Sequence, residues 1–194
     1  GFYGKIGYVP STLSIDLIKP VSTLTMDSDI SPHSIIPYSK LSDDQKEKFH
    51  FQVDSLLQTT LPDVDLKIPI KAYDQFGQGE TLLFMRKNTP IAVAILQTKP
   101  SLVEEQNKLL RIVTCVAHSK TPDGYFSYFL QDFLTYARDN YMDRILIRTP
   151  VHSQKTFQAL LNNNYRVVNS DLRMTLKGFP ETNNPKLFLM NRWV

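Results

Sequence analysis

LLRIVTCVAH at residues 109–118 opens the stretch that decides the fold, residues 109–165, which reads as strand, loop, helix, strand and helix. It is an apolar run of strand length, rich in β-branched side chains, and the breaker SKTPDG at 119–124 ends it. RILIRTP at 144–150 is a second buried strand that stops at proline. Between them, residues 125–142 carry apolar side chains with a helical period, at Phe126, Phe129, Leu130, Phe133, Leu134, Ala137 and Tyr141.

This strand–helix–strand unit predicts two parallel strands joined by a right-handed crossover helix. A further helix is expected over HSQKTFQALLNNN, residues 152–164. The loop at 119–124 is the natural ligand position, because free backbone N–H groups and the helix dipole face outward at the start of a helix.

The flanking segments complete an α/β pattern. Ser42 and Gln45 form a capping box, and an amphipathic helix follows it. Residues 61–79 are irregular, and two strands at 81–87 and 91–98 flank a tight turn and predict a hairpin. Three more strands are expected at 165–168, 172–176 and 186–194. The prediction is a mixed sheet, antiparallel in its first half and parallel at the central crossover, flanked by helices.

The first 40 residues read differently. Residues 1–21 open on a helix end at Phe2 and Tyr3 and continue as a strand over residues 13–18, in which Leu13, Ile15 and Leu17 alternate with other residues. We expect this strand to pair with a sheet edge, in this chain or in a neighbouring copy. Residues 22–40 are rich in Ser, Thr, Asp and Pro and predict a linker.

Composition excludes several classes of protein. The net charge is +3 and the 22 basic residues are scattered singly, so no nucleic-acid partner is expected. Cys115 is the single cysteine, and the four histidines have no metal-ligand spacing, so neither a disulfide nor a metal site is expected. Without an apolar run of about 18 residues or a signal peptide, a cytoplasmic protein with no membrane contact is the expectation.

The element order over residues 41–194 resembles that of the GCN5-related N-acetyltransferases (GNAT). FYGKIGY at 2–8 resembles the very end of a GNAT domain, and the corresponding piece in the second half is ALLNNNYRVV at 159–168. The resemblance implies a tandem arrangement: residues 1–21 as the tail of one domain, 22–40 as a linker and 41–194 as a second domain. It also implies acetyl transfer from acetyl-CoA to an amine of unknown type, with a homodimer or strand exchange through residues 1–21 left open.

In the family, the loop after this central strand binds the pyrophosphate of acetyl-CoA through Gln/Arg-x-x-Gly-x-Gly/Ala. The match places Gly124 on the first glycine, Thr121 on the Gln/Arg position and Phe126 on the second glycine, with Tyr125 beside them. The resemblance further implies that the backbone of Cys115, Val116 and Ala117 binds the pantetheine arm. On physical grounds Thr121 and Pro122 read as N-cap and first residue of the helix, and Asp123 adds a negative charge to its first turn, which favours a self-capped helix without ligand.

The acid that protonates the leaving thiolate is a tyrosine in many GNAT enzymes. Tyr3 matches this position in the N-terminal tail, whereas Leu160 occupies it in the second domain and cannot donate a proton. Tyr125 is the alternative acid by sequence, and His118 or His152 could act as a base at a strand end. Two functions stay open: an acetyltransferase with a degenerate cofactor loop, or a catalytically silent GNAT-like module that serves substrate binding or assembly.

Overall fold

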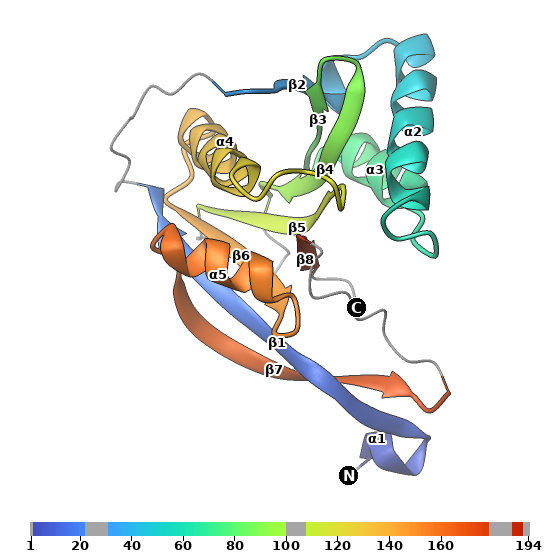
Figure 1. The fold of residues 1–194 in the computed structure, drawn as a ribbon, viewed down its shortest axis with the longest axis vertical. Coiled ribbons are helices and arrows are strands. Elements are labelled where there is room, and N and C mark those ends of the chain that lie inside the picture. The colour runs from blue at the N-terminus through green and yellow to red at the C-terminus, as the bar shows by residue number, and fades with distance from the viewer. Residues whose placement is uncertain (1, 22–30, 100–107, 179–187, 192–194) are drawn as a thin grey trace.

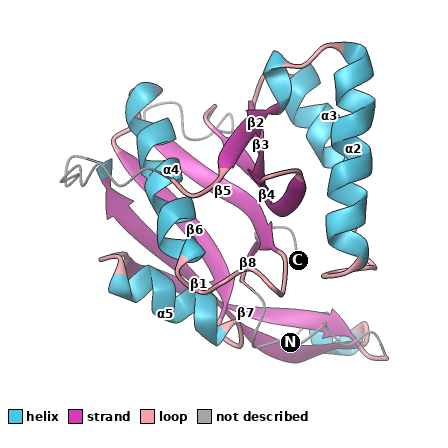
Figure 2. Ribbon diagram, turned by 45° about the horizontal axis from the view of Figure 1, so that its top comes forward, coloured by secondary structure: helices cyan, strands magenta, loops and turns pink. Residues whose placement is uncertain are grey.

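Strand β5 (Leu109–Ala117) runs through the middle of a twisted mixed sheet with helices on both faces (Figures 1 and 2). The computed structural model describes residues 2–21, 31–99, 108–178 and 188–191. The sheet has eight strands in the order β2-β3-β4-β5-β6-β1-β7, and β8 pairs with β5 off this path. The strands are β1 (Tyr8–Pro20), β2 (Ser34–Pro37), β3 (Gly79–Arg86), β4 (Thr89–Gln97), β5, β6 (Arg144–Pro150), β7 (Arg166–Leu176) and β8 (Leu189–Asn191).

Two pairs of helices cover opposite faces of this sheet. Helices α4 (Tyr125–Asp139) and α5 (Gln154–Asn162) lie on one face, and α2 (Asp43–Gln58) and α3 (Lys67–Gln75) lie on the other (Figure 2). The short elements are helix α1 (Phe2–Lys5) and the 3₁₀ turn η2 (Tyr38–Lys40). Neighbouring strands are antiparallel except for β5 and β6, as expected for a strand–helix–strand crossover.

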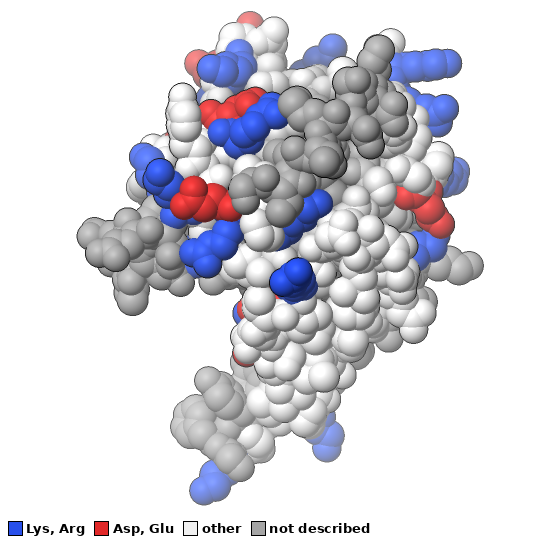
Figure 3. Space-filling model, turned by 90° about the vertical axis from the view of Figure 1, so that its left-hand side faces the viewer, with Lys and Arg blue, Asp and Glu red and all other residues white. Residues whose placement is uncertain are grey.

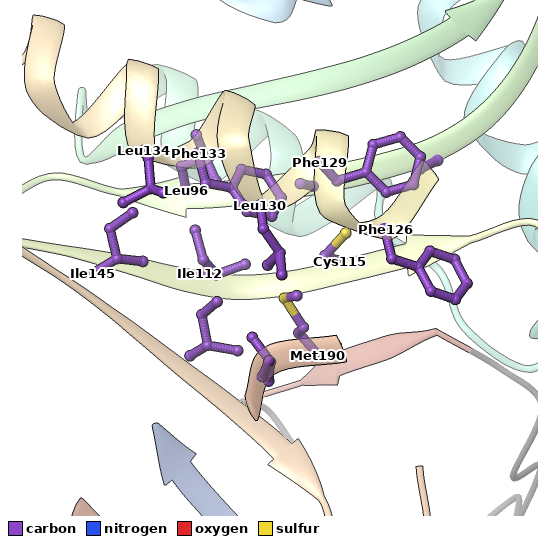
Figure 4. Close-up of a cluster of buried hydrophobic side chains, with 14 of the residues drawn as sticks. Leu96, Ile112, Cys115, Phe126, Phe129, Leu130, Phe133, Leu134, Ile145 and Met190 are labelled. Carbon is purple, nitrogen blue, oxygen red and sulfur yellow. The ribbon is translucent and has the colours of Figure 1, made fainter. Parts of the chain in front are cut away.

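The larger core lies under α4 and α5. Five phenylalanine and leucine residues of α4 are buried, and they pack on apolar side chains of β5 such as Ile112 and Cys115 (Figure 4). A second core packs α2 and α3 on β3, β4 and β5. Among the described residues, β1 and β6 contribute only to the first core and β7 to neither, so the other face of these strands has no helical cover.

Several sequence predictions are confirmed. The capping box is present at α2, where the backbone N–H of Ser42 donates to Gln45 Oε1 over 2.9 Å. The hairpin is β3–β4, the crossover is β5–α4–β6, and the predicted 13–18 strand is part of β1. β1 pairs within this chain, between β6 and β7, and is therefore not added at an edge of the sheet.

Other boundaries differ from the predictions. α3 forms inside the segment predicted to be irregular, because Pro69 falls in the first turn of the helix, where proline is tolerated. Residues 34–37 of the predicted linker form β2 and pair with β3. The two strands predicted at 165–168 and 172–176 are the single strand β7, since residues 169–171 continue the ladder with β1. Most of the strand predicted at 186–194 lies outside the described residues, and β8 is its described part.

Candidate cofactor site

β5 and β6 separate halfway along their length, and the opening between them is the first half of the candidate site. They pair in parallel only from Leu109 to Ile112 of β5. Beyond that point β5 pairs with β8, antiparallel, with Thr114 opposite Asn191 and Val116 opposite Leu189. The chain's own β8 therefore lies in the opening where β5 and β6 diverge.

Two buried threonines bind β8 from the side opposite β5. The Oγ1 hydroxyl of Thr149, on β6, donates to the carbonyl of Leu189 over 2.9 Å. The backbone N–H of Leu189 donates to Oγ1 of Thr156, on α5, over 2.8 Å. Both threonines are fully buried. The opening is thus lined by backbone polar groups of β5 and by two hydroxyls, and β8 satisfies them.

The three predicted backbone positions of β5 are all engaged by this segment. Cys115 faces Met190 and Val116 faces Leu189 in the ladder, and the Ala117 N–H donates to the carbonyl of Phe188 over 3.2 Å. Burial raises the pKa of the Cys115 thiol well above its usual range, so the thiol is a core group and not a nucleophile.

A basic pocket at the carboxyl end of β5 is the second half of the candidate site. It has a volume of about 580 Å³ and lies between the β3–β4 turn and the loop that leads into α4. All of its charged side chains are cationic, namely Arg86, Lys87 and Lys120. The rest of its lining is Thr89, Pro90, Ile91, His118, Thr121, Pro122 and Tyr125. Such a pocket beside the start of a helix is suited to a phosphate or another anion.

Tyr125, predicted from the sequence, opens α4 and faces this pocket. The guanidinium carbon of Arg86 lies 5.6 Å from the centre of its ring, within the range of a cation–π contact. His118 also lines the pocket, and its Nδ1 accepts a hydrogen bond from the backbone N–H of Lys120 over 3.0 Å. This bond fixes the loop, and because Nδ1 accepts, the neutral ring carries its proton on Nε2, which could donate to a ligand and not act as the predicted base.

The predicted helix start at Thr121 and Pro122 is wrong. α4 begins at Tyr125 with Gly124 as N-cap, and no side chain caps it. The hydroxyl of Thr121 instead donates to the carbonyl of Ile91 over 3.1 Å and ties the loop to β4. Asp123 forms an exposed ion pair with Lys155 of α5 at 2.7 Å, so its charge is partly neutralised.

Four further candidates lie elsewhere. Phe126 is buried and stacks on Phe188 with ring centres 4.0 Å apart, so it packs on the segment leading into β8 and not into the pocket. Leu160, which matches the family's acid position, is completely buried in the core under α5. Tyr3 belongs to α1, at the far end of β1 from the body, and its side chain lies outside what the structure describes (Figure 1). His152 follows β6, with Nδ1 at 3.4 Å from Oγ1 of Thr12.

The sequence analysis missed the residues that make the pocket basic and those that bind β8. Arg86 and Lys87 come from the β3–β4 turn, more than 30 residues before the loop, and only the fold brings them to Lys120. Thr149 and Thr156 carry no motif, although a hydroxyl in a buried strand is itself a signal of a polar partner. In the described ranges no three His, Cys, Asp or Glu side chains form a potential metal site, and no helix is long and apolar enough to cross a membrane.

The fold has clear counterparts among solved structures. The acetyltransferase of the GNAT family from Colwellia psychrerythraea superposes with a TM-score of 0.57 at 8% identity, covering 83% of this chain and 54% of that one. GCN5-related N-acetyltransferases from Sphaerobacter thermophilus and from Anabaena variabilis ATCC 29413 follow. Their TM-scores are 0.55 and 0.54, their identities 9% and 17%, and the matches cover 93% and 89% of this chain and 57% and 42% of theirs.

This chain therefore spans about half the length of the solved acetyltransferases that it resembles. No protein-family model matches the sequence, and no curated protein does. At these identities the likeness concerns the fold: the protein has the mixed α/β fold of the GNAT acetyltransferases.

Proposed function

We propose that the protein transfers an acetyl group from acetyl-CoA to an amine, and that the basic pocket binds the phosphates of the cofactor. The observation that carries the proposal is the cluster of Arg86, Lys87 and Lys120 beside the start of α4, in a GNAT fold. The amine nitrogen would attack the thioester carbonyl, a C–N bond would form as the C–S bond breaks, and the proton lost by the amine would balance the one gained by sulfur.

Tyr125 is the tyrosine of the pocket and our proposed acid for the leaving thiolate. A positioned acid accounts for about 10²–10⁴-fold in rate, so Tyr125→Phe should lower kcat by at least about a hundredfold. The affinity for acetyl-CoA should change little. An enzyme indifferent to this change would exclude Tyr125 as the acid.

Calorimetric titration with acetyl-CoA tests the pocket. Arg86→Ala and Lys120→Ala should each weaken binding about tenfold, the usual size of a charge-assisted hydrogen bond to phosphate. Lys71→Ala on α3, an exposed lysine on the other face of the sheet, is the matched control and should leave the affinity unchanged. Equal effects of all three would contradict a phosphate site in this pocket.

A second function is favoured by a different observation, the pairing of β8 along β5. An acyl arm that used the backbone of Thr114–Val116 would have to displace β8, so a chain in which β8 stays in place would be a silent module for substrate binding or assembly. Hydrogen exchange with and without acetyl-CoA separates the two functions. Faster exchange of the β8 amides on binding supports transfer, whereas no binding at millimolar acetyl-CoA supports the silent module.

A further inference from the structure

The two longest strands, β1 and β7, begin with the same local structure. Each follows a helix and one residue in the left-handed region: Gly7, with φ of 89°, precedes Tyr8, and Asn164, with φ of 62°, precedes Tyr165. Aligning Gly7 with Asn164 matches each residue of the α1–β1 segment with the residue 157 positions later. α1 is then the counterpart of α5, and β1 the counterpart of β7.

The pairing of β1 with β7 agrees with this offset of 157 residues. β1 and β7 are antiparallel, and Ser14 lies opposite Asp171, which is also the residue 157 positions after it. A strand pair whose central residue faces its own counterpart has a local twofold axis at that point. The half of β1 from Ser14 to Pro20 therefore corresponds to the segment 171–177, which is the distal half of β7.

These two corresponding halves have very different surroundings. From Ser14 to Pro20, β1 pairs on its second edge with β6, and the core under α4 and α5 buries Ile15 and Leu17 to 8% and 0% exposure. The counterpart of Ile15 is Leu172, which is 58% exposed. In the strand order of the described residues β7 is terminal, so no described strand pairs with the second edge of its distal half.

The distal half of the ribbon also exposes large hydrophobic side chains. β1 and β7 extend away from the body as a two-stranded ribbon with α1 at its tip (Figure 1). On the face shown in Figure 3, the surface of the lower half of the molecule is largely without charged side chains. Large hydrophobic side chains exposed on the distal ribbon and at its tip are Ile6, Tyr8, Val9, Leu13, Leu172 and Leu176. Exposed hydrophobic side chains that lie together, such as Leu13 and its ladder partner Leu172, are typical of an interaction site.

We infer that a second unit of this same fold docks on the distal half of the ribbon. The unit would place a strand beside residues 171–177, as β6 lies beside Ser14–Pro20, and its helices would cover Leu172 as α4 and α5 cover Ile15. α1 is its last helix, the counterpart of α5. Because α1 leads directly into β1, this unit precedes β1 in the same polypeptide, and the two units exchange strands through the ribbon.

Hydrogen exchange measured on the full natural polypeptide and on residues 1–194 alone tests the inference. In the full polypeptide, the amides of residues 172–176 that point away from β1 should exchange at least about tenfold more slowly, because they gain strand partners. Equal exchange in the two proteins would overturn the inference, as would a natural polypeptide with no α/β unit before Gly1. Protection that appears in residues 1–194 only at high concentration would assign the surface to a second copy and overturn it too.

Two substitutions sharpen this test. Leu172→Asp, on the distal half, should lower the Tm of the full polypeptide by about 3 °C or more and leave that of residues 1–194 nearly unchanged. Val168→Asp is the matched control, because Val168 lies on the same strand, is 56% exposed and belongs to the half next to the body. Equal shifts for both substitutions in the full polypeptide would contradict docking on the distal half.

Discussion

The two halves of the sheet differ in how many faces are covered. β3, β4 and β5 lie between α2 and α3 on one face and α4 on the other, and six or more successive residues of each strand are buried. β6 and β1 have one face in the first core and one without helical cover, and β7 contributes to neither core. The sequence of β1 alternates accordingly at Ile15–Asp16–Leu17. A strand that is covered on both faces, such as β5, thus has a continuous apolar run. The strand β1, which is covered on one face, has an alternating run.

The uncovered face of the second half is polar and ordered. The guanidinium of Arg148 donates to both carboxylate oxygens of Asp16, over 2.6 and 2.7 Å, and to Asp171 over 2.6 Å. These hydrogen bonds raise the pKa of Arg148 further, and they connect β6, β1 and β7 across their side chains. One half of the sheet is therefore stabilised by two apolar cores, and the other by one core and an ionic network.

The largest effect is expected where the two halves meet, at the segment leading into β8. Phe188 is 1% exposed and stacks on Phe126. Phe188→Ala should lower the free energy of unfolding by about 3–5 kcal/mol, the usual cost of a buried phenylalanine. Urea denaturation measures it, with Phe51→Ala as control, because Phe51 on α2 is 74% exposed and its loss should cost less than about 0.5 kcal/mol. Similar losses for both would show that this segment is not part of the core.

The second prediction concerns the core of the less covered half. Leu160 is completely buried, so Leu160→Tyr should overpack the space under α5 and cost about 1–3 kcal/mol. Leu161→Tyr, one residue further on the same helix and 39% exposed, should be nearly neutral. If the Leu160 variant unfolded at the same urea concentration as the parent and gained transferase activity, the side chain at position 160 would face the active site and not the core.

The third prediction compares ion pairs on the two halves. Arg148→Met should cost about 1–3 kcal/mol, because it leaves Asp16 with 12% side-chain exposure and without its charged donor. On the other half, Lys46 pairs with Asp74 at 2.7 Å through a single nitrogen, and Lys46→Met should cost less than about 1 kcal/mol. Double-mutant cycles with Asp16→Asn and Asp74→Asn measure both couplings. A larger coupling for Lys46 would reverse this comparison.

Much of the fold follows from periodicity in the sequence. β5, α4 and β6 are strongly periodic or continuously apolar, and their predicted positions agree with the structure to within three residues. α3 was not predicted, because Pro62, Pro69, Gly77 and Gly79 suggested an irregular segment, although Pro69 lies in the first turn of the helix, where proline is tolerated. β7 was divided because its middle, residues 169–171, is polar, although these residues continue the ladder with β1 without apolar side chains.

The candidate site was less predictable, because its parts are distant in the sequence. Local motif reasoning found Tyr125 and the loop at 119–124, which do line the pocket. It could not assign Arg86 to the same pocket, since that depends on where the β3–β4 turn lies over β5. Nor could it place β8 beside Thr114–Val116, because strand order is set by packing of the whole sheet.

The smallest expected effect tests whether water reaches the core between α2 and the strands β3, β4 and β5. His50 on α2 is 3% exposed, and its Nε2 lies 2.9 Å from the hydroxyl of Tyr38. Burial lowers its pKa, with Lys71 and Lys67 acting in the same direction and Glu47 and Asp54 opposing them. Because its pKa is lowered, His50 binds fewer protons in the folded protein than in the unfolded chain. The contribution of the neutral His50 to the free energy of unfolding is therefore complete above pH 6.5 and is lost as the pH falls. Relative to His50→Gln, the parent should lose up to about 1 kcal/mol between pH 7 and pH 5.5, measured by urea denaturation at each pH. The free energy of unfolding of the parent relative to His50→Gln could instead stay constant or increase at low pH. Either result would mean that water or a carboxylate reaches His50 in the folded state.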